Sequence, residues 1–147
     1  MGPSSFPPPI GGYRRRVPSP YPPIEPHAAG ELDVGDGEVL HWECCGRRDG
    51  RAAVVLHGGP GSGCTPALRR LFDPAVHRVV LFDQRGAGRS TPNAGDPATS
   101  LAANTTHHLV EDIERLRRHL DVDRWLVCGV SWGARSGWRT PSGILST

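Results

Sequence analysis

A pentapeptide of the form G-x-S-x-G is the sharpest candidate for chemistry in this sequence. It spans residues 129–133 and follows directly on a short apolar run at 125–128. A serine on a tight strand-to-helix turn stands exposed above the sheet, Gly129 and Gly133 let backbone pass closely, and the next backbone N–H points at a developing oxyanion. The pattern therefore predicts Ser131 as a nucleophile, and the alternative is an inert serine in a glycine-rich turn.

A glycine-rich segment after the apolar run at 52–56 is the second candidate. It reads His57, Gly58, Gly59, Pro60 and Gly61. Such a turn can offer a backbone N–H to the same oxyanion. A phosphate-binding loop is excluded, because Cys64 stands where a third glycine is needed and the chain contains no Lys. His57 precedes the turn instead of facing the serine, so we expect it to be structural.

A third polar segment, residues 83–90, follows the apolar run at 78–82 and begins with Asp83, Gln84 and Arg85. Charged side chains at the carboxyl end of a strand can face a ligand crevice. They can equally form a buried polar network that holds loops together, and we favour the network.

Two histidines, His107 and His108, lie in the first turn of a predicted helix. Adjacent helical side chains point about 100° apart, so this pair does not chelate one metal ion. We expect no metal site and no cofactor.

The composition excludes several other classes of protein. All 17 basic residues are Arg, which removes Schiff-base chemistry by Lys. Residues 27–133 hold 12 Arg and 14 acidic residues, so the body lacks the basic face of a nucleic-acid-binding protein. No apolar run approaches the ~18 residues of a membrane span, and no secretory signal is evident. The four cysteines form no C-x-x-C pair and predict reduced thiols in the cytoplasm.

The elements that must position these segments can be predicted from periodicity. The apolar runs at 52–56, 78–82 and 125–128 do not alternate, which is typical of strands buried on both faces of a parallel sheet. A further strand is predicted at 38–44. A helix is predicted from about 105 to 120, because apolar residues recur there at steps of four and three. Asn104 or Thr105 can cap its start. The resulting class is α/β.

The first 26 residues differ sharply from the rest. They hold nine of the 15 prolines and very few aliphatic side chains. Such a segment cannot bury enough apolar surface to offset its ordering entropy, so we expect a disordered or polyproline-like arm. A ligand for a proline-reading module is the alternative to a solvated tail.

Seven segments in chain order carry a resemblance to a known family. They are residues 21–26, 32–37, 57–61, 83–90, 104–106, 108–117 and 129–133. Over roughly residues 20–133 the chain resembles the N-terminal half of a proline iminopeptidase (prolyl aminopeptidase), an α/β-hydrolase-fold serine peptidase. The resemblance implies that Ser131 is the nucleophile and that the backbone N–H groups of Gly59 and Trp132 form the oxyanion hole. It also implies peptide substrates with an N-terminal proline, an acyl-enzyme and no cofactor.

The sequence departs from this family in two places. Val130 stands where the family usually has Gly. Residues 134–147 contain Gly137 and Pro141, which break the helix expected behind the nucleophile. We interpret the chain as a truncated or frame-shifted product. A partial α/β-hydrolase domain at 27–133, truncated after the nucleophile turn and left with an open apolar strand edge, is followed by an atypical tail at 134–147.

The triad of this fold runs Ser, then Asp, then His along the chain. Residues 132–147 contain no Asp, no Glu and no His. We therefore expect the chain to be inactive by itself. The alternatives are another α/β hydrolase, such as an esterase or amidase, and a non-catalytic interaction protein that uses the proline-rich arm.

Overall fold

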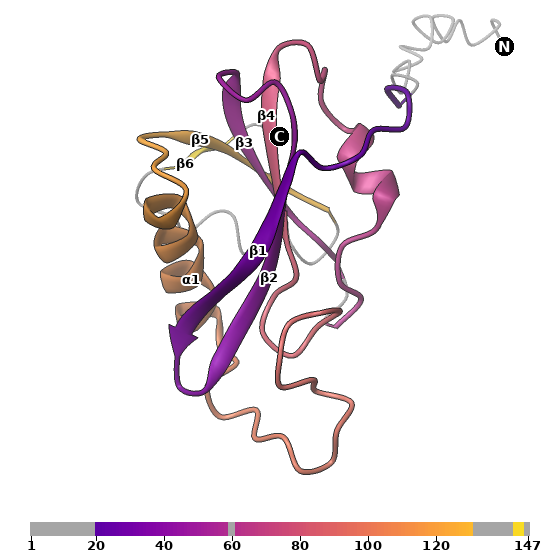
Figure 1. The fold of residues 1–147 in the computed structure, drawn as a ribbon. Coiled ribbons are helices and arrows are strands. Elements are labelled where there is room, and N and C mark those ends of the chain that lie inside the picture. The colour runs from indigo at the N-terminus through magenta and orange to yellow at the C-terminus, as the bar shows by residue number, and fades with distance from the viewer. Residues whose placement is uncertain (1–19, 59–60, 131–142, 146–147) are drawn as a thin grey trace, which may run out of the picture.

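A six-stranded mixed sheet forms the centre of the molecule (Figure 1). The computed structural model describes residues 20–58, 61–130 and 143–145. The strands are β1 (Ala28–Gly35), β2 (Glu38–Gly46), β3 (Arg51–Leu56), β4 (His77–Phe82), β5 (Trp125–Gly129) and β6 (Gly143–Leu145), in the spatial order β1-β2-β4-β3-β5-β6. β1, β2 and β4 pair antiparallel, whereas β4, β3, β5 and β6 are mutually parallel. The predicted α/β class is confirmed.

The three apolar runs form the parallel centre of the sheet, as predicted. Residues 53–56 of β3 and 79–82 of β4 are all buried, because they have a covered face on both sides. β2 extends to Gly46, two residues beyond its predicted end, and pairs with β4 from Trp42 to Gly46.

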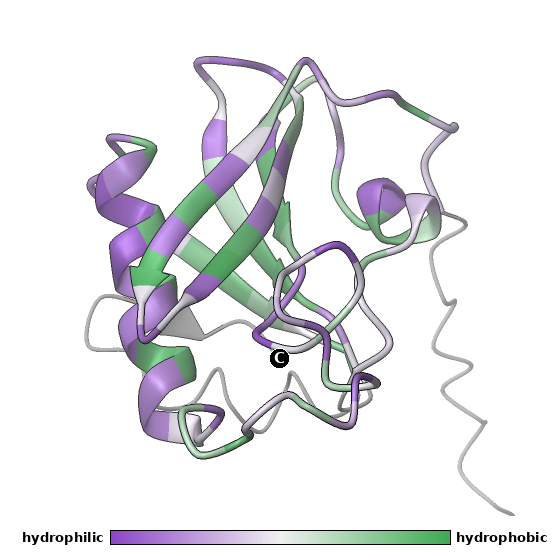
Figure 2. Cartoon of the chain, turned by 60° about the horizontal axis from the view of Figure 1, so that its bottom comes forward, coloured by the Kyte–Doolittle hydropathy of each residue, from purple (hydrophilic) through white to green (hydrophobic). Residues whose placement is uncertain are grey.

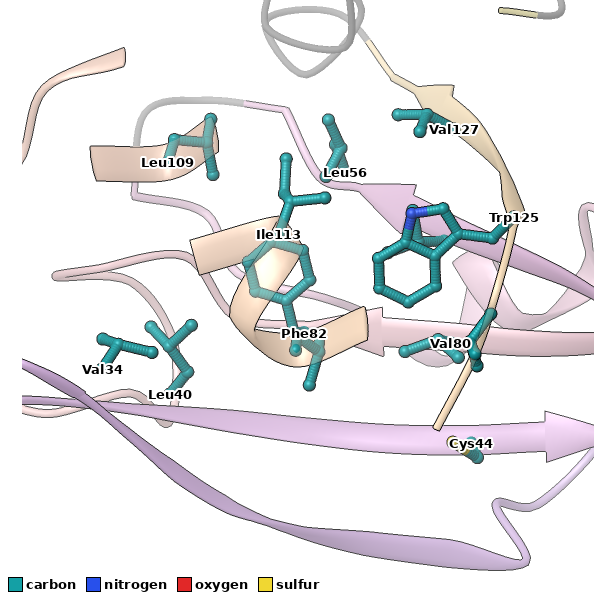
Figure 3. Packing of buried hydrophobic residues seen from close by; sticks show 13 residues of the cluster. Val34, Leu40, Cys44, Leu56, Val80, Phe82, Leu109, Ile113, Trp125 and Val127 are labelled. Atoms are coloured by element: carbon teal, nitrogen blue, oxygen red, sulfur yellow. The ribbon is translucent and has the colours of Figure 1, made fainter. Parts of the chain in front are cut away.

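One face of the sheet is covered by helix α1 (Thr106–His119), one residue shorter at each end than predicted. The Thr105 hydroxyl accepts the His108 backbone N–H and so caps the start of the helix. Leu109 and Ile113 project onto the sheet towards Leu56 and Phe82 (Figure 3). Figure 2 shows hydrophilic residues on the outward side of α1 and largely hydrophobic strands behind it. No described helix is long and apolar enough to cross a membrane.

The opposite face of the sheet is covered by the short 3₁₀ helix η1 (Pro66–Arg70) and by residues near it. Ile24 and Leu68 pack there against a buried cluster made up of Cys45, Val55, Val79 and Leu81. The Tyr21 backbone N–H donates to the Arg70 carbonyl at 3.0 Å. Residues 20–26 therefore contact the folded body, so the boundary predicted after residue 26 lies too late. The rest of the predicted arm, residues 1–19, lies outside the described residues.

The edge of the sheet beside β5 is occupied, whereas the sequence predicted that it is open. β6 pairs in parallel with β5, with Trp125 opposite Gly143 and Val127 opposite Leu145. The prediction of an open edge was wrong, because a short apolar run inside the atypical tail supplies a strand. The predicted helix breakers Gly137 and Pro141 lie outside the described residues.

Candidate active site

The loops after β3 and β4 and the end of β5 meet at one edge of the sheet, because the three strands are parallel neighbours. Leu56, the last residue of β3, pairs with Gly129, the last residue of β5. The Val130 backbone N–H then donates to the Leu56 carbonyl at 3.0 Å. The glycine-rich segment and the G-x-S-x-G segment therefore start side by side.

Five predicted site residues lie outside the described part of the chain, and their roles stay predictions. They are Gly59, Pro60, Ser131, Trp132 and Gly133. Near the same edge, a cavity of about 630 Å³ is lined by residues that include Gly61, Gln84, Arg85 and Asn104.

His57 is locked between the two loops. It is 1% exposed, and its Nε2 accepts the Gln84 backbone N–H at 3.0 Å. The ring proton therefore sits on Nδ1, which donates to the Gly58 carbonyl at 2.8 Å. In return, Gln84 Nε2 donates to the His57 carbonyl at 3.0 Å. Both ring nitrogens are used, which favours the structural role expected for His57.

Asp83 accepts hydrogen bonds from both loops. Its Oδ1 takes the Cys64 backbone N–H at 2.6 Å. Its Oδ2 takes the Arg89 backbone N–H at 2.8 Å and the Arg89 Nε–H at 3.1 Å. Burial of Asp83 opposes ionisation, but the donors of Cys64 and Arg89 outweigh it and hold the pKa of the carboxyl below its usual value.

Arg85 uses all five of its N–H donors. It binds Asp112 on α1 through Nε at 2.7 Å and Nη2 at 2.8 Å. Nη1 donates to Asp36 at 3.1 Å and to the Ala103 carbonyl at 2.9 Å, and Nη2 reaches the Val34 carbonyl at 3.4 Å. Hydrogen bonding to Asp112 raises the pKa of Arg85, so the guanidinium stays charged. These contacts favour the network interpretation of residues 83–90.

Several residues in this network were missed at the level of sequence. Asp112 and Asp36 are not among the site residues predicted above. A second buried pair joins Glu43 on β2 to Arg69 of η1 at 2.7 Å. Nothing in the sequence signals these pairs, since their members lie far apart along the chain.

Metal and thiol chemistry find little support in the described residues. No group of three or more His, Cys, Asp and Glu side chains there could hold a metal ion. His107 Nε2 lies 3.2 Å from Glu111 Oε1, one turn along the same helix. All four cysteines are free thiols, and burial raises the pKa of each, for Cys45 to about 11.

Two curated proteins are similar in sequence to most of this chain. The protein named "Probable proline iminopeptidase" of Streptomyces coelicolor is 61% identical over 119 residues, which is 81% of this chain and 37% of that protein. The proline iminopeptidase of Xanthomonas citri is 56% identical over 114 residues, which is 78% of this chain and 35% of that protein. The resemblance to proline iminopeptidases is thereby confirmed.

Solved structures show the same architecture. A proline iminopeptidase-related protein of Thermus thermophilus matches with a TM-score of 0.66 and 34% identity, over 80% of this chain and 43% of that one. An epoxide hydrolase of Vigna radiata matches with a TM-score of 0.61 and 28% identity, over 79% of this chain and 34% of that one.

The curated relatives are much longer than the matched segment, and the chain spans about a third of their length. The family model described as "alpha/beta hydrolase fold" matches residues 53–141, which is more than half of the 147 residues. The chain therefore belongs to the α/β-hydrolase fold family.

Proposed function

We propose that this chain carries the nucleophile-bearing part of a prolyl aminopeptidase. Ser131 Oγ attacks the carbonyl carbon of an N-terminal proline residue and forms an acyl-enzyme, which water then hydrolyses. The backbone N–H groups of Gly59 and Trp132 stabilise the oxyanion formed in each step. The substrate is a peptide with an N-terminal proline, and neither metal nor cofactor takes part.

The observation that carries this proposal is the pairing of Leu56 with Gly129. It places Leu56, which directly precedes the glycine-rich segment, beside Gly129, the first residue of the G-x-S-x-G segment. The hydrogen bond from the Val130 N–H to the Leu56 carbonyl extends that contact by one residue. An oxyanion hole needs one donor from each of two loops that meet at the nucleophile. Identities of 44–61% with proteins named as proline iminopeptidases favour this peptidase over an esterase or amidase.

We also propose that the 147 residues by themselves do not catalyse turnover of a substrate. Residues 132–147 offer no Asp, Glu or His. His57 is committed to Gln84 and Gly58, so it is not free to serve as the base. The four free thiols suit a reducing compartment, and we propose the cytoplasm.

A segment graft tests the proposal directly. Residues 20–133 replace the corresponding segment of the Streptomyces coelicolor relative, which retains its own C-terminal part. We expect the graft to release proline from a proline arylamide and to lose this activity on Ser131→Ala, whereas Ser100→Ala, at an exposed serine outside both candidate segments, leaves it active. A folded graft that cleaves ester or alkyl-amide substrates but no proline arylamide would favour the alternative hydrolases.

A further inference from the structure

One carboxylate joins the end of the glycine-rich loop to the loop after β4. We define the oxyanion loop as residues 57–64. Asp83 directly follows β4 and is 1% exposed. Its two oxygens accept the backbone N–H of Cys64 at 2.6 Å and the backbone N–H of Arg89 at 2.8 Å. A single buried side chain therefore satisfies backbone donors in both loops.

The two ends of the oxyanion loop are held by consecutive residues. At its start, Gln84 exchanges two hydrogen bonds with His57, each at 3.0 Å. At its end, Asp83 binds the Cys64 N–H, and the Cys64 thiol donates to the Phe82 carbonyl at 3.2 Å. The loop is thus anchored at both ends to the carboxyl end of β4.

Close backbone packing fixes the place of the carboxylate. A Cβ added at Gly63 would lie 2.9 Å from Gly88 Cα, and one added at Gly88 would lie 2.5 Å from Asp83 Oδ2. Only glycine allows this approach at either position. The backbones of the two loops and the Asp83 carboxylate are therefore packed too closely for a side chain at position 63 or 88.

We propose that Asp83 is a positioning residue for the oxyanion loop, because its carboxylate ties the end of that loop to the backbone at residues 88–89. The inference rests on the proposed function, which places an oxyanion donor in this loop. Donors that are fixed before the reaction need no reorganisation as charge develops, and small displacements weaken them. A carboxylate suits the task because it only accepts, whereas an amide would turn an NH₂ group towards a donor.

The wild-type chain itself provides the first test. The neighbouring charged groups are Arg89, whose Nε lies 3.1 Å from Asp83, and Glu43, which lies 3.6 Å from Arg89. In ¹⁵N-labelled protein titrated towards acid pH, we expect the Cys64 and Arg89 amide resonances to shift in one common transition. Separate transitions, or none at either amide, would overturn the proposal without any variant.

Amide hydrogen exchange provides the second test. Asp83→Asn removes at least one of the acceptors, so we expect exchange at residues 61–64 and 86–89 to accelerate about tenfold while α1 keeps its wild-type rates. The matched control is Asp96→Asn, because Asp96 caps only its own exposed turn through the Ala98 N–H at 2.9 Å. Equal acceleration throughout the chain would show a role in global stability only, and unchanged rates would overturn the positioning role.

A second variant displaces the carboxylate without removing it. Gly88→Ala introduces a side chain at a φ of 51° and drives its Cβ against Asp83. Gly37→Ala imposes a similar backbone strain at a φ of 76°, but its Cβ meets no atom of the described residues within 4 Å. We expect faster amide hydrogen exchange at residues 61–64 in Gly88→Ala only. The same acceleration in both variants would overturn the proposal.

These measurements separate the two proposals. An inactive graft with the expected amide behaviour would reject the proposed peptidase activity and leave Asp83 as a link between two loops. An active graft without the common titration would reject the role of Asp83 alone.

Discussion

Arg85 and Asp112 form a two-pronged ion pair inside the protein, with Nε–Oδ2 and Nη2–Oδ1 distances of 2.7 and 2.8 Å. Their side chains are 3% and 1% exposed. The pair joins the loop after β4 to α1, and Arg85 also reaches Asp36 in the β1–β2 turn. One guanidinium thus joins the loop after β4, helix α1 and the β1–β2 turn.

We expect Arg85→Met to lower the free energy of unfolding by about 3–5 kcal/mol, because it leaves the Asp112 carboxylate buried without a partner. The matched control is Arg47→Met, which removes the ion pair between Arg47 and Asp49. These two side chains are 56% and 76% exposed. An exposed pair contributes little to stability, because solvent and salt screen both charges. Urea unfolding of the two variants measures the difference, and equal losses would contradict the assigned importance of the buried pair.

The burial of Glu38 predicts that this carboxylate lowers the stability of the folded protein as the pH rises. A carboxylate held by an ion pair would have the opposite effect. Glu38 is buried at the start of β2, and its Oε2 has no hydrogen-bond partner among the described residues. Burial raises the pKa of Glu38, and the Arg85 charge only partly opposes this. An acid with a raised pKa in the folded state binds its proton more tightly there, so it costs stability above its unfolded pKa of about 4.3.

We therefore expect Glu38→Gln to raise the urea midpoint at pH 7 and to change it little at pH 4, where the carboxyl is largely protonated in both states. Glu31→Gln is the control, since Glu31 is an exposed residue of the neighbouring strand β1. A loss of stability at pH 7 in Glu38→Gln would contradict the prediction.

Gly46 has a conformation and a surrounding that only glycine tolerates. Its φ is 78°, and an added Cβ would lie 2.4 Å from the His77 carbonyl oxygen. We expect Gly46→Ala to cost about 1–2 kcal/mol for the backbone and about 1–3 kcal/mol for the clash. Gly37→Ala, at a φ of 76° and with no atom of the described part of the chain within 4 Å, should lose only the free energy of the backbone strain. Thermal unfolding compares them, and equal midpoints would show that the β2–β4 contact yields without cost.

Local patterns predicted the elements around the site, because each pattern depends on neighbouring residues. The apolar runs of β3, β4 and β5 and the apolar stripe of α1 are signals of this kind, although in β5 only Trp125 and Val127 are fully buried. The Thr105 cap is another, since the hydroxyl bonds a residue three positions away.

Long-range pairing was out of reach of such patterns. Asp112 lies 27 residues from Arg85, and nothing in the local spacing selects that partner among the acids of the chain. The same holds for β6, a three-residue strand that exists because β5 offers it an edge. It holds as well for residues 20–26, whose proline content hides contacts with η1.

The last prediction concerns activity of the chain as it stands. We expect the 147 residues to show no steady release of proline from a proline arylamide, because loss of the general base from a serine hydrolase costs a factor on the order of 10⁶ in turnover. A serine-directed phosphonate should likewise fail to label Ser131 faster than other serines. Turnover that persists in Ser100→Ala and disappears in Ser131→Ala would contradict this, since a base would then have to act on Ser131 from upstream of it, where His57 already uses both ring nitrogens.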